Sequence, residues 1–309
     1  MSVPALSGRA VQGPRVVVVG DVATDFLAAL GRPIAVGSDT PAEIRLIGGG
    51  QAANTAAWLA WQGQPVTLAG CVGDDQFGRA RLAELTALGV DCAVRRCPGT
   101  PTGSVIVLSL GEDRTMITQR GANRQLSVAD VDAALATASG VGHLHLSGYV
   151  LLDVASRQAG LRVLAAGRER GLPVSVDAAS TQPLSEAGVP DYLDWICGVE
   201  VLLANAAEAA LLTSCGDPES AARALTAVAR NVVVKLGAAG ALWAGQEGTL
   251  IRSPGQRVRV ADTTGAGDAF AAGLLAALVA GAEPPAALER ASALGSEAVA
   301  ALGARPAAG

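Results

Sequence analysis

The hydrophobic positions along the chain follow the pattern of buried strands that alternate with helices. The run Arg15-Val16-Val17-Val18-Val19-Gly20 predicts a buried strand that enters a glycine turn. From about residue 127 the alternation becomes regular. It predicts strands at 143–146, 174–177, 201–204 and 232–236, and helices at 128–138, 154–170, 205–214, 218–229 and 285–302. Such a chain forms a mostly parallel sheet with helices on both faces, and ligands bind beyond the carboxyl ends of its strands.

Two early segments break this rhythm because they alternate polar and apolar residues. Residues 31–47 hold short alternating pieces, and residues 102–120 alternate on both sides of the expected hairpin turn Gly111-Glu112-Asp113. We expect both segments to form a small β lid inserted into one α/β domain that spans residues 1–309. An exposed lid strand could pair with its copy in a homodimer, which would also cover its edge.

Composition narrows the class of protein. The 309 residues are 50% hydrophobic and 17% charged, which is enough for a sizeable core. A net charge of −5 gives no electrostatic footprint for nucleic acid. The five cysteines include no C-x-x-C, which favours reduced thiols in a cytoplasmic protein. Residues 1–14 lack the apolar segment of a signal peptide, and the apolar run 269–282 is too short and glycine-interrupted to span a bilayer.

The most informative stretch is Asp262-Thr263-Thr264-Gly265-Ala266-Gly267-Asp268. Val258 and Val260 alternate with arginines before it, which predicts a strand, and the apolar run after it predicts a buried helix. Small residues between them let the backbone approach a ligand, and the free N–H groups at a helix start can bind an anion. Asp268 would lie at the mouth of this anion site, where it could accept a proton from a hydroxyl that attacks a bound phosphate. The alternative is structural: a helix capped by Asp262 or Thr264.

The longer string D-T-T-G-A-G-D-A-F-x-x-G, residues 262–273, resembles the C-terminal signature of the ribokinase-like carbohydrate kinases, the PfkB family. The resemblance implies a three-layer fold with a lid, ATP as phosphoryl donor and Mg²⁺ as its metal. It also implies that Asp268 is the catalytic base and that the amides of Gly265, Ala266 and Gly267 form an anion hole. A Walker A loop is excluded because it needs a Gly-Lys pair, and the only lysine, Lys235, follows Val234.

A second motif, Gly49-Gly50-Gln51-Ala52-Ala53-Asn54-Thr55-Ala56, resembles the N-terminal signature of the same family, and the match continues through residues 68–78. In the family the glycine pair, Gly49 and Gly50 here, lets a sugar approach the backbone, and the residue matching Asn54 bonds its hydroxyls. Gln51 stands where ribokinases usually carry lysine. Asp25 matches a sugar-binding aspartate of the family, although a surface aspartate that caps a turn would look the same.

Two shorter motifs point to the nucleotide. Asn205 and Glu208 resemble the N-x-x-E motif of the family, which organises Mg²⁺ through its waters. The same letters also suit a helix capping box. Lys235, Gly237 and Gly240 lie at the turn where the family places its nucleotide, although Lys235 could equally end a strand in solvent.

The resemblance leaves the substrate open. Asp25, Gln51 and Asn54 together offer acceptors and donors for hydroxyls, which favours a neutral pentose or hexose. A nucleoside kinase of the same family and a non-catalytic sugar or nucleotide sensor are the alternatives. Many relatives are activated by K⁺, and the resemblance places such a monovalent cation at Asp262 and Thr264, with carbonyls from residues 298–307.

Overall fold

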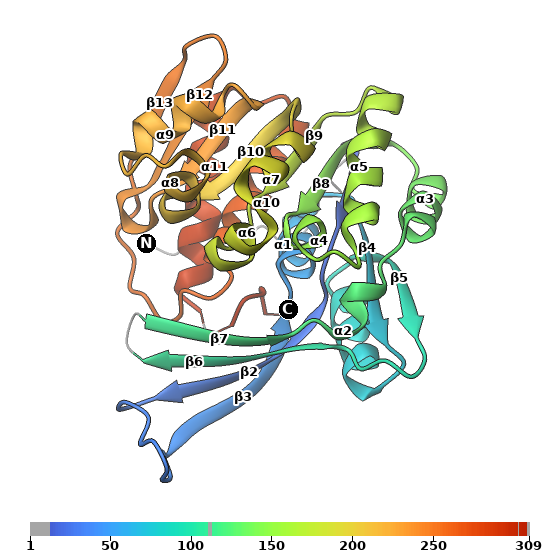
Figure 1. Cartoon of the computed structure of the whole chain (residues 1–309), viewed down its shortest axis with the longest axis vertical. Helices are drawn as coiled ribbons and strands as arrows, with labels where there is room; N and C mark the ends of the chain where they lie inside the picture. Colours follow the sequence, from blue (N-terminus) through green and yellow to red (C-terminus); the bar gives the residue numbers. More distant parts are fainter. Residues whose placement is uncertain (1–12, 111–112, 302, 308–309) are drawn as a thin grey trace.

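The computed structural model describes residues 13–110, 113–301 and 303–307, and its frame is a nine-stranded sheet (Figure 1). Its strands are β1 (Arg15–Val19), β4 (Val66–Gly73), β5 (Asp91–Cys97), β8 (Val141–Ser147), β9 (Val174–Asp177), β10 (Val199–Asn205), β11 (Ala229–Lys235), β12 (Ala241–Gly245) and β13 (Leu250–Ser253). They lie in the order β13-β12-β11-β10-β9-β8-β1-β4-β5. Neighbours from β5 to β11 are parallel, and β12 and β13 add an antiparallel hairpin at one edge. The structure confirms the mostly parallel sheet that the alternating pattern predicted.

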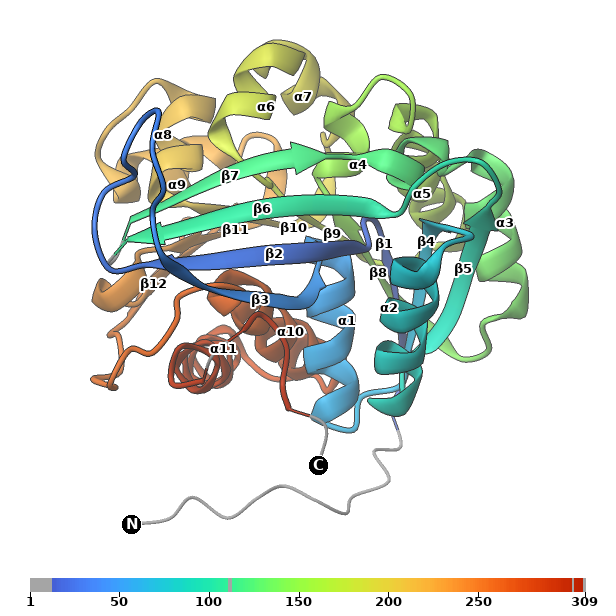
Figure 2. The same ribbon diagram turned by 90° about the horizontal axis from the view of Figure 1, so that it is seen from below.

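Helices cover both faces of this sheet (Figure 2). On one face lie α1 (Gln51–Trp61), α2 (Gln76–Ala87), α10 (Ala266–Val279) and α11 (Pro284–Val299). On the other lie α3 (Val128–Thr137), α4 (Tyr149–Leu152), α5 (Arg157–Arg170), α6 (Thr181–Ala187), α7 (Val189–Trp195), α8 (Ala206–Thr213) and α9 (Pro218–Leu225). In β1, Val16 and Val18 pack with α1 and α10, whereas Val17 and Val19 pack with α3 and α5. A strand buried on both faces explains its unbroken valine run.

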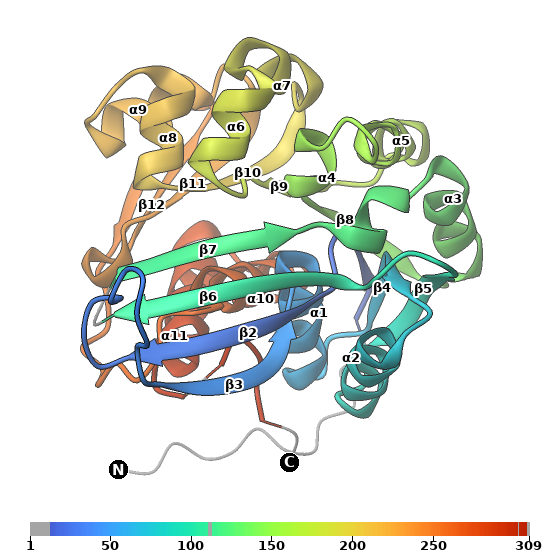
Figure 3. The ribbon, with the colours of Figure 1, turned by 60° about the horizontal axis from the view of Figure 1, so that its bottom comes forward.

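The lid is a separate four-stranded sheet that crosses the carboxyl ends of the central strands (Figure 3). It consists of β2 (Ala23–Leu30), β3 (Ala42–Gly49), β6 (Gly103–Leu110) and β7 (Asp113–Gln119), in the order β3-β2-β6-β7. The sequence did not predict β2, and residues 31–41 form no strand. The predicted hairpin is present as β6 and β7, and its turn residues Gly111 and Glu112 lie outside the described residues.

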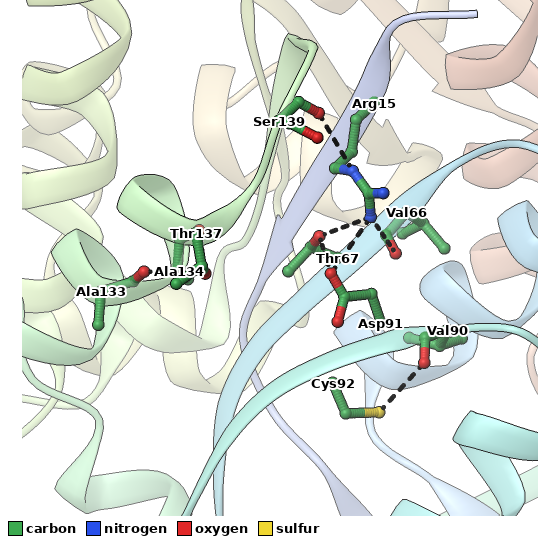
Figure 4. A network of polar contacts seen from close by, with 10 residues as sticks. All are labelled: Arg15, Val66, Thr67, Val90, Asp91, Cys92, Ala133, Ala134, Thr137 and Ser139. Atoms are coloured by element: carbon green, nitrogen blue, oxygen red, sulfur yellow. Dashed lines mark hydrogen bonds and ion pairs between the residues drawn. The ribbon is translucent and has the colours of Figure 1, made fainter. Parts of the chain in front are cut away.

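Arg15 links the amino-terminal ends of β1, β4 and β5 through hydrogen bonds (Figure 4). Its Nη1 donates to Oγ1 of Thr67 at 2.9 Å and to Oδ2 of Asp91 at 3.3 Å, and its Nε donates to the carbonyl of Ser139 at 3.3 Å. Thr67 also donates to Asp91 at 3.0 Å. These contacts tie β1, β4 and β5 together at the end of the sheet opposite to the lid.

One predicted strand is absent. Val258 and Val260 lie in an irregular segment and are 40% and 56% exposed, because no strand of the described sheet pairs with this stretch. The apolar helix begins at Ala266 rather than at residue 269, and the last helix ends at Val299. Strand β5 and helices α4, α6 and α7 were not predicted, and the three helices are only four to seven residues long. All five cysteines are free thiols, and in the described part of the chain no helix is long and apolar enough to cross a membrane.

Candidate active site

A cavity of about 930 Å³ lies between the lid and the carboxyl ends of the central strands. Its wall contains most of the residues singled out from the sequence: Asp25, Gly50, Gln51, Asn54, Asn205, Glu208, Lys235, Gly237, Gly240, Thr264, Gly265, Ala266, Gly267 and Asp268. Two further predicted residues do not line the cavity but contact residues that do. Gly49 lies against the carboxylate of Asp25, and Asp262 accepts a hydrogen bond from Thr264. Segments that are far apart in the sequence therefore meet in one cavity.

The loop before α10 presents backbone N–H groups to this cavity. Gly265 is the residue that precedes the helix, its φ is 75°, and no side chain caps the helix. The expected cap by Asp262 or Thr264 is therefore not formed. A Cβ at Gly265 would lie 2.5 Å from the carbonyl oxygen of Ala304, so this position requires glycine. Because the first N–H groups of a helix have no partners within it, this end of α10 can bind an anion.

Asp268 lies in the first turn of α10, and its carboxyl group faces the cavity. Nδ2 of Asn54 donates a hydrogen bond to its Oδ2 at 2.8 Å. Burial raises the pKa of Asp268 to about 8, although the hydrogen bond from Asn54 opposes this rise. The charge of Asp177 raises the same pKa further, and that of Lys235 lowers it. A carboxylate with a pKa near neutrality is well matched to proton transfer.

A chain of polar groups crosses the strand ends beside the anion site. Nζ of Lys235 lies 2.7 Å from Oδ2 of Asp177, and Nε2 of Gln51 donates to Oδ1 of Asp177 at 3.0 Å. Oγ of Ser147 lies 2.6 Å from Oε1 of Gln51 and 3.0 Å from Oδ1 of Asp21. The amide of Gln51 is thus engaged on both sides by protein groups, and it links the two halves of the cavity.

Lys235 carries a positive charge next to the anion site rather than in solvent. A Cβ at Gly267 would lie 3.4 Å from Nζ of Lys235, so the ammonium group is adjacent to the start of α10. Burial lowers the pKa of Lys235, but the carboxylates of Asp177 and Glu208 raise it above its ordinary value. The side chain therefore remains protonated at neutral pH.

Asn205 and Glu208 form the capping box of α8. Oδ1 of Asn205 accepts from the backbone N–H of Glu208 at 2.9 Å, and Oε2 of Glu208 accepts from the backbone N–H of Asn205 at 2.8 Å. Burial raises the pKa of Glu208 to about 7, and the charge of Lys235 opposes the rise. Both side chains still line the cavity, so one pair of residues forms the cap and also faces the site.

The opposite end of the cavity contains Asp25. This residue is 6% exposed, and its Oδ1 has no hydrogen-bond partner among the described residues. Burial raises the pKa of Asp25 to about 6, and the charge of Arg305 lowers it. A Cβ at Gly49 would collide with the Asp25 carboxylate, and a Cβ at Gly50 would lie 2.5 Å from the carbonyl oxygen of Asp21. The glycine pair therefore leaves room for a buried carboxylate with a free acceptor.

Asp262 and Thr264 form a tight polar turn beneath the anion site. Oδ1 of Asp262 accepts from the N–H of Thr264 at 2.8 Å and from its hydroxyl at 2.6 Å, and Oδ2 accepts from the N–H of Gly303 at 3.0 Å. Burial raises the pKa of Asp262, but these hydrogen bonds outweigh it and hold the pKa below its ordinary value. Nη1 of the lid residue Arg114 donates to the Thr264 hydroxyl at 3.1 Å, which brings a guanidinium group to the place expected for a cation.

Two buried charged residues of the site were not found from the sequence. Asp177 ends the predicted strand 174–177, and a carboxylate at the carboxyl end of a buried strand was a usable signal. Arg305 gave no such signal because it follows the last helix, in a segment without periodicity. It donates from Nε to Oδ1 of Asn54 at 3.0 Å and from Nη2 to the carbonyl of Gly49 at 2.7 Å.

Comparison with known proteins identifies the family. The model of the pfkB family carbohydrate kinases matches residues 14–308. The chain belongs to the PfkB family. It is 31% identical over 279 residues to the 2-dehydro-3-deoxygluconokinase of Thermoproteus tenax, with 85% of each chain covered. It is also 31% identical over 296 residues to the ATP-dependent ribose-1-phosphate kinase of Halopiger xanaduensis, with 95% of this chain and 94% of the relative covered.

Solved structures agree on the fold. A probable sugar kinase from Rhizobium etli CFN 42 superposes with a TM-score of 0.86 at 23% identity, with 96% of each chain covered. The adenosine kinase of Sinorhizobium meliloti gives a TM-score of 0.85 at 22% identity over the same shares. The ribokinase-like fold expected from the two motifs is therefore confirmed. As a PfkB kinase, the chain is an enzyme of a family that phosphorylates sugars and nucleosides with ATP.

Proposed function

We propose that this kinase transfers the γ-phosphoryl group of ATP to a hydroxyl of a neutral sugar, with Asp268 as the general base. The observation that carries the proposal is the position of Asp268: it begins α10 beside the anion site and faces the same cavity as Asp25. A hydroxyl bound between these two carboxylates would be next to a phosphoryl group held at the helix start.

Asp268 would accept the hydroxyl proton as the oxygen attacks the γ-phosphorus atom, while the bond from that atom to the ADP oxygen breaks. The amides of Gly265, Ala266 and Gly267 would stabilise negative charge on the transferring group. Lys235 would add a fixed positive charge on the same side. Since little covalent chemistry is required of the protein, positioning and electrostatics would supply most of the rate.

The nucleotide is proposed to lie over the turn at Gly237 and Gly240. Both glycines have positive φ, 59° and 97°, and both face the cavity. A Cβ at Gly240 would collide with the carbonyl oxygen of Ser253, so the close turn requires glycine there. The position of Lys235 at the end of the preceding strand supports its assignment to the phosphates of the nucleotide.

A magnesium ion fits this site through its water shell. Asn205 and Glu208 bond one another and both line the cavity, and a carboxylate oxygen that accepts one hydrogen bond can still accept another from a metal-bound water. Among the described residues no group of three potential protein ligands surrounds a point, which suits Mg²⁺ because it keeps several waters. When bound, the metal would neutralise charge on the phosphates, and Asn205 and Glu208 would orient its waters.

We assign the sugar to Asp25, Gly49, Gly50, Gln51 and Asn54. Asp25 supports this assignment most directly, because it lines the cavity and its covered Oδ1 has no partner among the described residues, so a small rotation of the carboxylate would let it accept from a hydroxyl. Gln51 would act through the polar chain to Asp177, since both atoms of its amide are engaged. Asn54 retains one N–H for a sugar hydroxyl.

The inner face of the lid favours a sugar over a nucleoside. The lid residues that line the cavity include Ala23, Val105, Met116 and Thr118, so the aromatic residues of the wall, Tyr149 and Phe270, come from α4 and α10 and not from the lid. Phe26, on β2, alternates to the other face and packs against Phe77 at 5.7 Å. A sugar acid is the second candidate, because Arg114, Arg120 and Arg257 also line the cavity and the Thermoproteus relative is named for such a substrate.

We also propose a cytoplasmic homodimer formed through the lid. Its outer face leaves Ile44, Leu46, Ile106 and Ile117 between 45% and 67% exposed. Sedimentation of the wild type and of an Ile106→Glu, Ile117→Glu variant would test this assembly. A wild type that sediments as a monomer at micromolar concentration would exclude it.

The central test is Asp268→Asn. We expect kcat to fall by at least about 10²-fold with little change in ATP affinity, because the base is lost and the anion site remains. The assay should use a mixture of sugars and nucleosides, so that the choice of substrate does not decide the result. Near-normal turnover would overturn the assignment of the base, and a wild type that binds sugar without turnover would favour a sensor.

A further inference from the structure

The chain after α11 passes beside α1 and α10 (Figure 2), and its residues 303–306 are buried, Arg305 among them. The Arg305 side chain is 4% exposed and contacts three different elements. Nε donates to Oδ1 of Asn54 at 3.0 Å on α1, and Nη2 donates to the carbonyl of Gly49 at 2.7 Å on β3. Nη1 lies 3.2 Å from Oε1 of Glu84 on α2. A planar guanidinium that reaches three elements is fixed in orientation.

The backbone around Arg305 is held just as firmly. The N–H of Gly303 donates to Oδ2 of Asp262 at 3.0 Å, and the indole N–H of Trp58 donates to the carbonyl of Ala304 at 3.0 Å. Gly265, at the anion site, packs so closely on Ala304 that no side chain fits there. The segment is thus anchored both to the anion-site loop and to α1.

Arg305 determines which way the Asn54 amide points. Arginine has only donors, so the atom of Asn54 that faces it must be the carbonyl oxygen Oδ1. Nδ2 is then directed to the other side, where it donates to Oδ2 of Asp268 at 2.8 Å. If Arg305 were absent, the amide could turn over and present its oxygen to the carboxylate.

We propose that Arg305 is a positioning residue that acts through Asn54 and selects which oxygen of Asp268 accepts the proton. The inference rests on the proposed function of Asp268 as base. With Oδ2 held as an acceptor by Asn54, Oδ1 is the oxygen left for the substrate hydroxyl. The proton moves from that hydroxyl to Oδ1 as its oxygen bonds to the phosphorus and ADP leaves. Neither Asn54 nor Arg305 gains or loses a proton.

A purely structural role predicts different behaviour. Arg305 also offsets the charges of Glu84 and Asp25, so its loss could simply loosen the fold or weaken sugar binding. The hydrogen bond from Asn54 lowers the pKa of Asp268. Loss of that bond must therefore move the acidic limb of the rate profile to higher pH. Loosened packing would admit water and weaken the burial that raises this pKa, so it would move the limb to lower pH, in the opposite direction.

The experiment is a double-mutant cycle between Arg305→Met and Asn54→Ala, read out as kcat against pH. Each single variant is expected to lose about tenfold to 100-fold in kcat, because the proton acceptor is misplaced. The acidic limb of the kcat profile should move to higher pH in both single variants. The kcat of the double variant should be no lower than that of the slower single variant. Arg305→Lys, which keeps the charge and N–H donors on a single nitrogen but loses the planar fork, should recover part of kcat. Arg290→Met removes an exposed arginine of α11 and is the matched control.

The proposal would be overturned if the fold-loss in kcat of the double variant equalled the product of the two single losses. It would also be overturned if the acidic limb of the kcat profile did not move. If Arg305→Met does not fold, Asn54→Ala still tests it, because alanine cannot donate to Asp268 and adds no charge beside it. Asn54→Ala should then show the upward shift alone, and an unshifted limb counts against the proposal. Asp268→Asn is measured in parallel: if it stays active, the proposed base fails, and if it is inactive without coupling between Arg305 and Asn54, only this inference fails.

Discussion

The ammonium group of Lys235 and the carboxylate of Asp177 form an ion pair of 2.7 Å at the ends of β11 and β9. Strand β10 lies between them, so the pair spans three adjacent strands of the central sheet. Their side chains are 15% and 2% exposed. A buried ion pair adds little net stability, because the loss of hydration offsets the attraction between the charges. We therefore expect the pair to have a functional role. Its place beside the first turn of α10 points to the phosphate groups.

We expect Lys235→Met to lower kcat by about 10²-fold and to raise the ATP KM, since a fixed positive charge next to the transferring group is lost. The variant should also unfold more easily, by about 3–5 kcal/mol, because Asp177 is left buried and unpaired. Steady-state kinetics and urea unfolding measure the two effects separately.

Lys235→Met combined with Asp177→Asn separates stability from catalysis. Removing both charges should restore much of the stability and leave kcat low. Arg230→Met, which removes only an exposed contact with Glu200, is the control. If the double variant regains normal turnover, Lys235 has a structural role alone.

The raised pKa of Asp268 gives a prediction for pH. The base must be ionised, so kcat/KM should rise about tenfold per pH unit below about pH 8 and then level off. The same carboxyl group holds a proton in the folded state between its ordinary value of 3.8 and about 8, whereas the unfolded chain has released it. Stability therefore falls as pH rises through that window. Asp268→Asn should flatten this fall, and an identical decline of Tm with pH in both proteins would contradict the assignment.

The capping box at Glu208 can be separated from a metal role by two substitutions. Glu208→Gln can still form the cap, because glutamine also accepts from the backbone N–H, whereas Glu208→Ala cannot. If Glu208 orients metal-bound waters, both variants should need several-fold more Mg²⁺ for half-maximal rate. The wild-type requirement should also fall as pH rises through about 7, where Glu208 ionises. A Glu208→Gln variant with normal Mg²⁺ dependence would show that Glu208 only caps α8 and does not act on the metal.

The fold was predictable because the sequence patterns of its strands and helices each lie within a short stretch of the chain. Continuous valine runs such as 16–19 and amphipathic helices such as 128–138 report burial directly, and their alternation implies a parallel sheet. Strand β2 was missed because its first three residues are all buried, including Thr24 and Asp25, so polar and apolar residues do not alternate with exposure. The segment around Val258 alternates without pairing, and alternation alone cannot supply a partner strand.

The site was predictable only where residues are contiguous. Gly265, Gly267 and Asp268 lie in one turn, so their order in the sequence predicts that they share one side of the cavity. Asn54 illustrates the limit: its residue type suits a sugar ligand, yet Arg305 and Asp268 already bond both ends of its amide. Such partners come from distant segments, and no local pattern records them.

A monovalent cation beside the anion site is tested by exchange of salts. Asp262, whose pKa is held low, would supply the negative charge, and K⁺ would stiffen the loop of Gly265. We expect several-fold faster turnover in potassium buffer than in buffer with only a bulky organic cation. Equal rates would exclude the cation, and the guanidinium of Arg114 at Thr264 would then be the local positive charge.

The identity of the substrate can be read from how the enzyme treats single hydroxyls. Asp25 is buried at the cavity wall, and its Oδ1 has no hydrogen-bond partner in the described part of the chain, so a sugar hydroxyl that donates to this carboxylate would satisfy it. Removal of that hydroxyl from the substrate should lower kcat/KM by at least about 10²-fold. Because the pKa of Asp25 is about 6, sugar KM should rise as pH falls below that value.

The measurement is kcat/KM for ribose, 2-deoxyribose, fructose, adenosine and a keto-deoxy sugar acid, in wild type and in Asp25→Ala. We expect a neutral sugar to be preferred, and the variant to lose both this preference and the penalty for a missing hydroxyl. Asp25→Asn tests the charge separately. The amide keeps an acceptor oxygen but has no negative charge to repel the carboxylate of the sugar acid. A sugar acid should therefore gain relative to ribose in Asp25→Asn. If adenosine or the sugar acid is the best wild-type substrate, or if Asp25→Ala leaves the preferred sugar unaffected, the assignment of Asp25 to a neutral sugar is wrong.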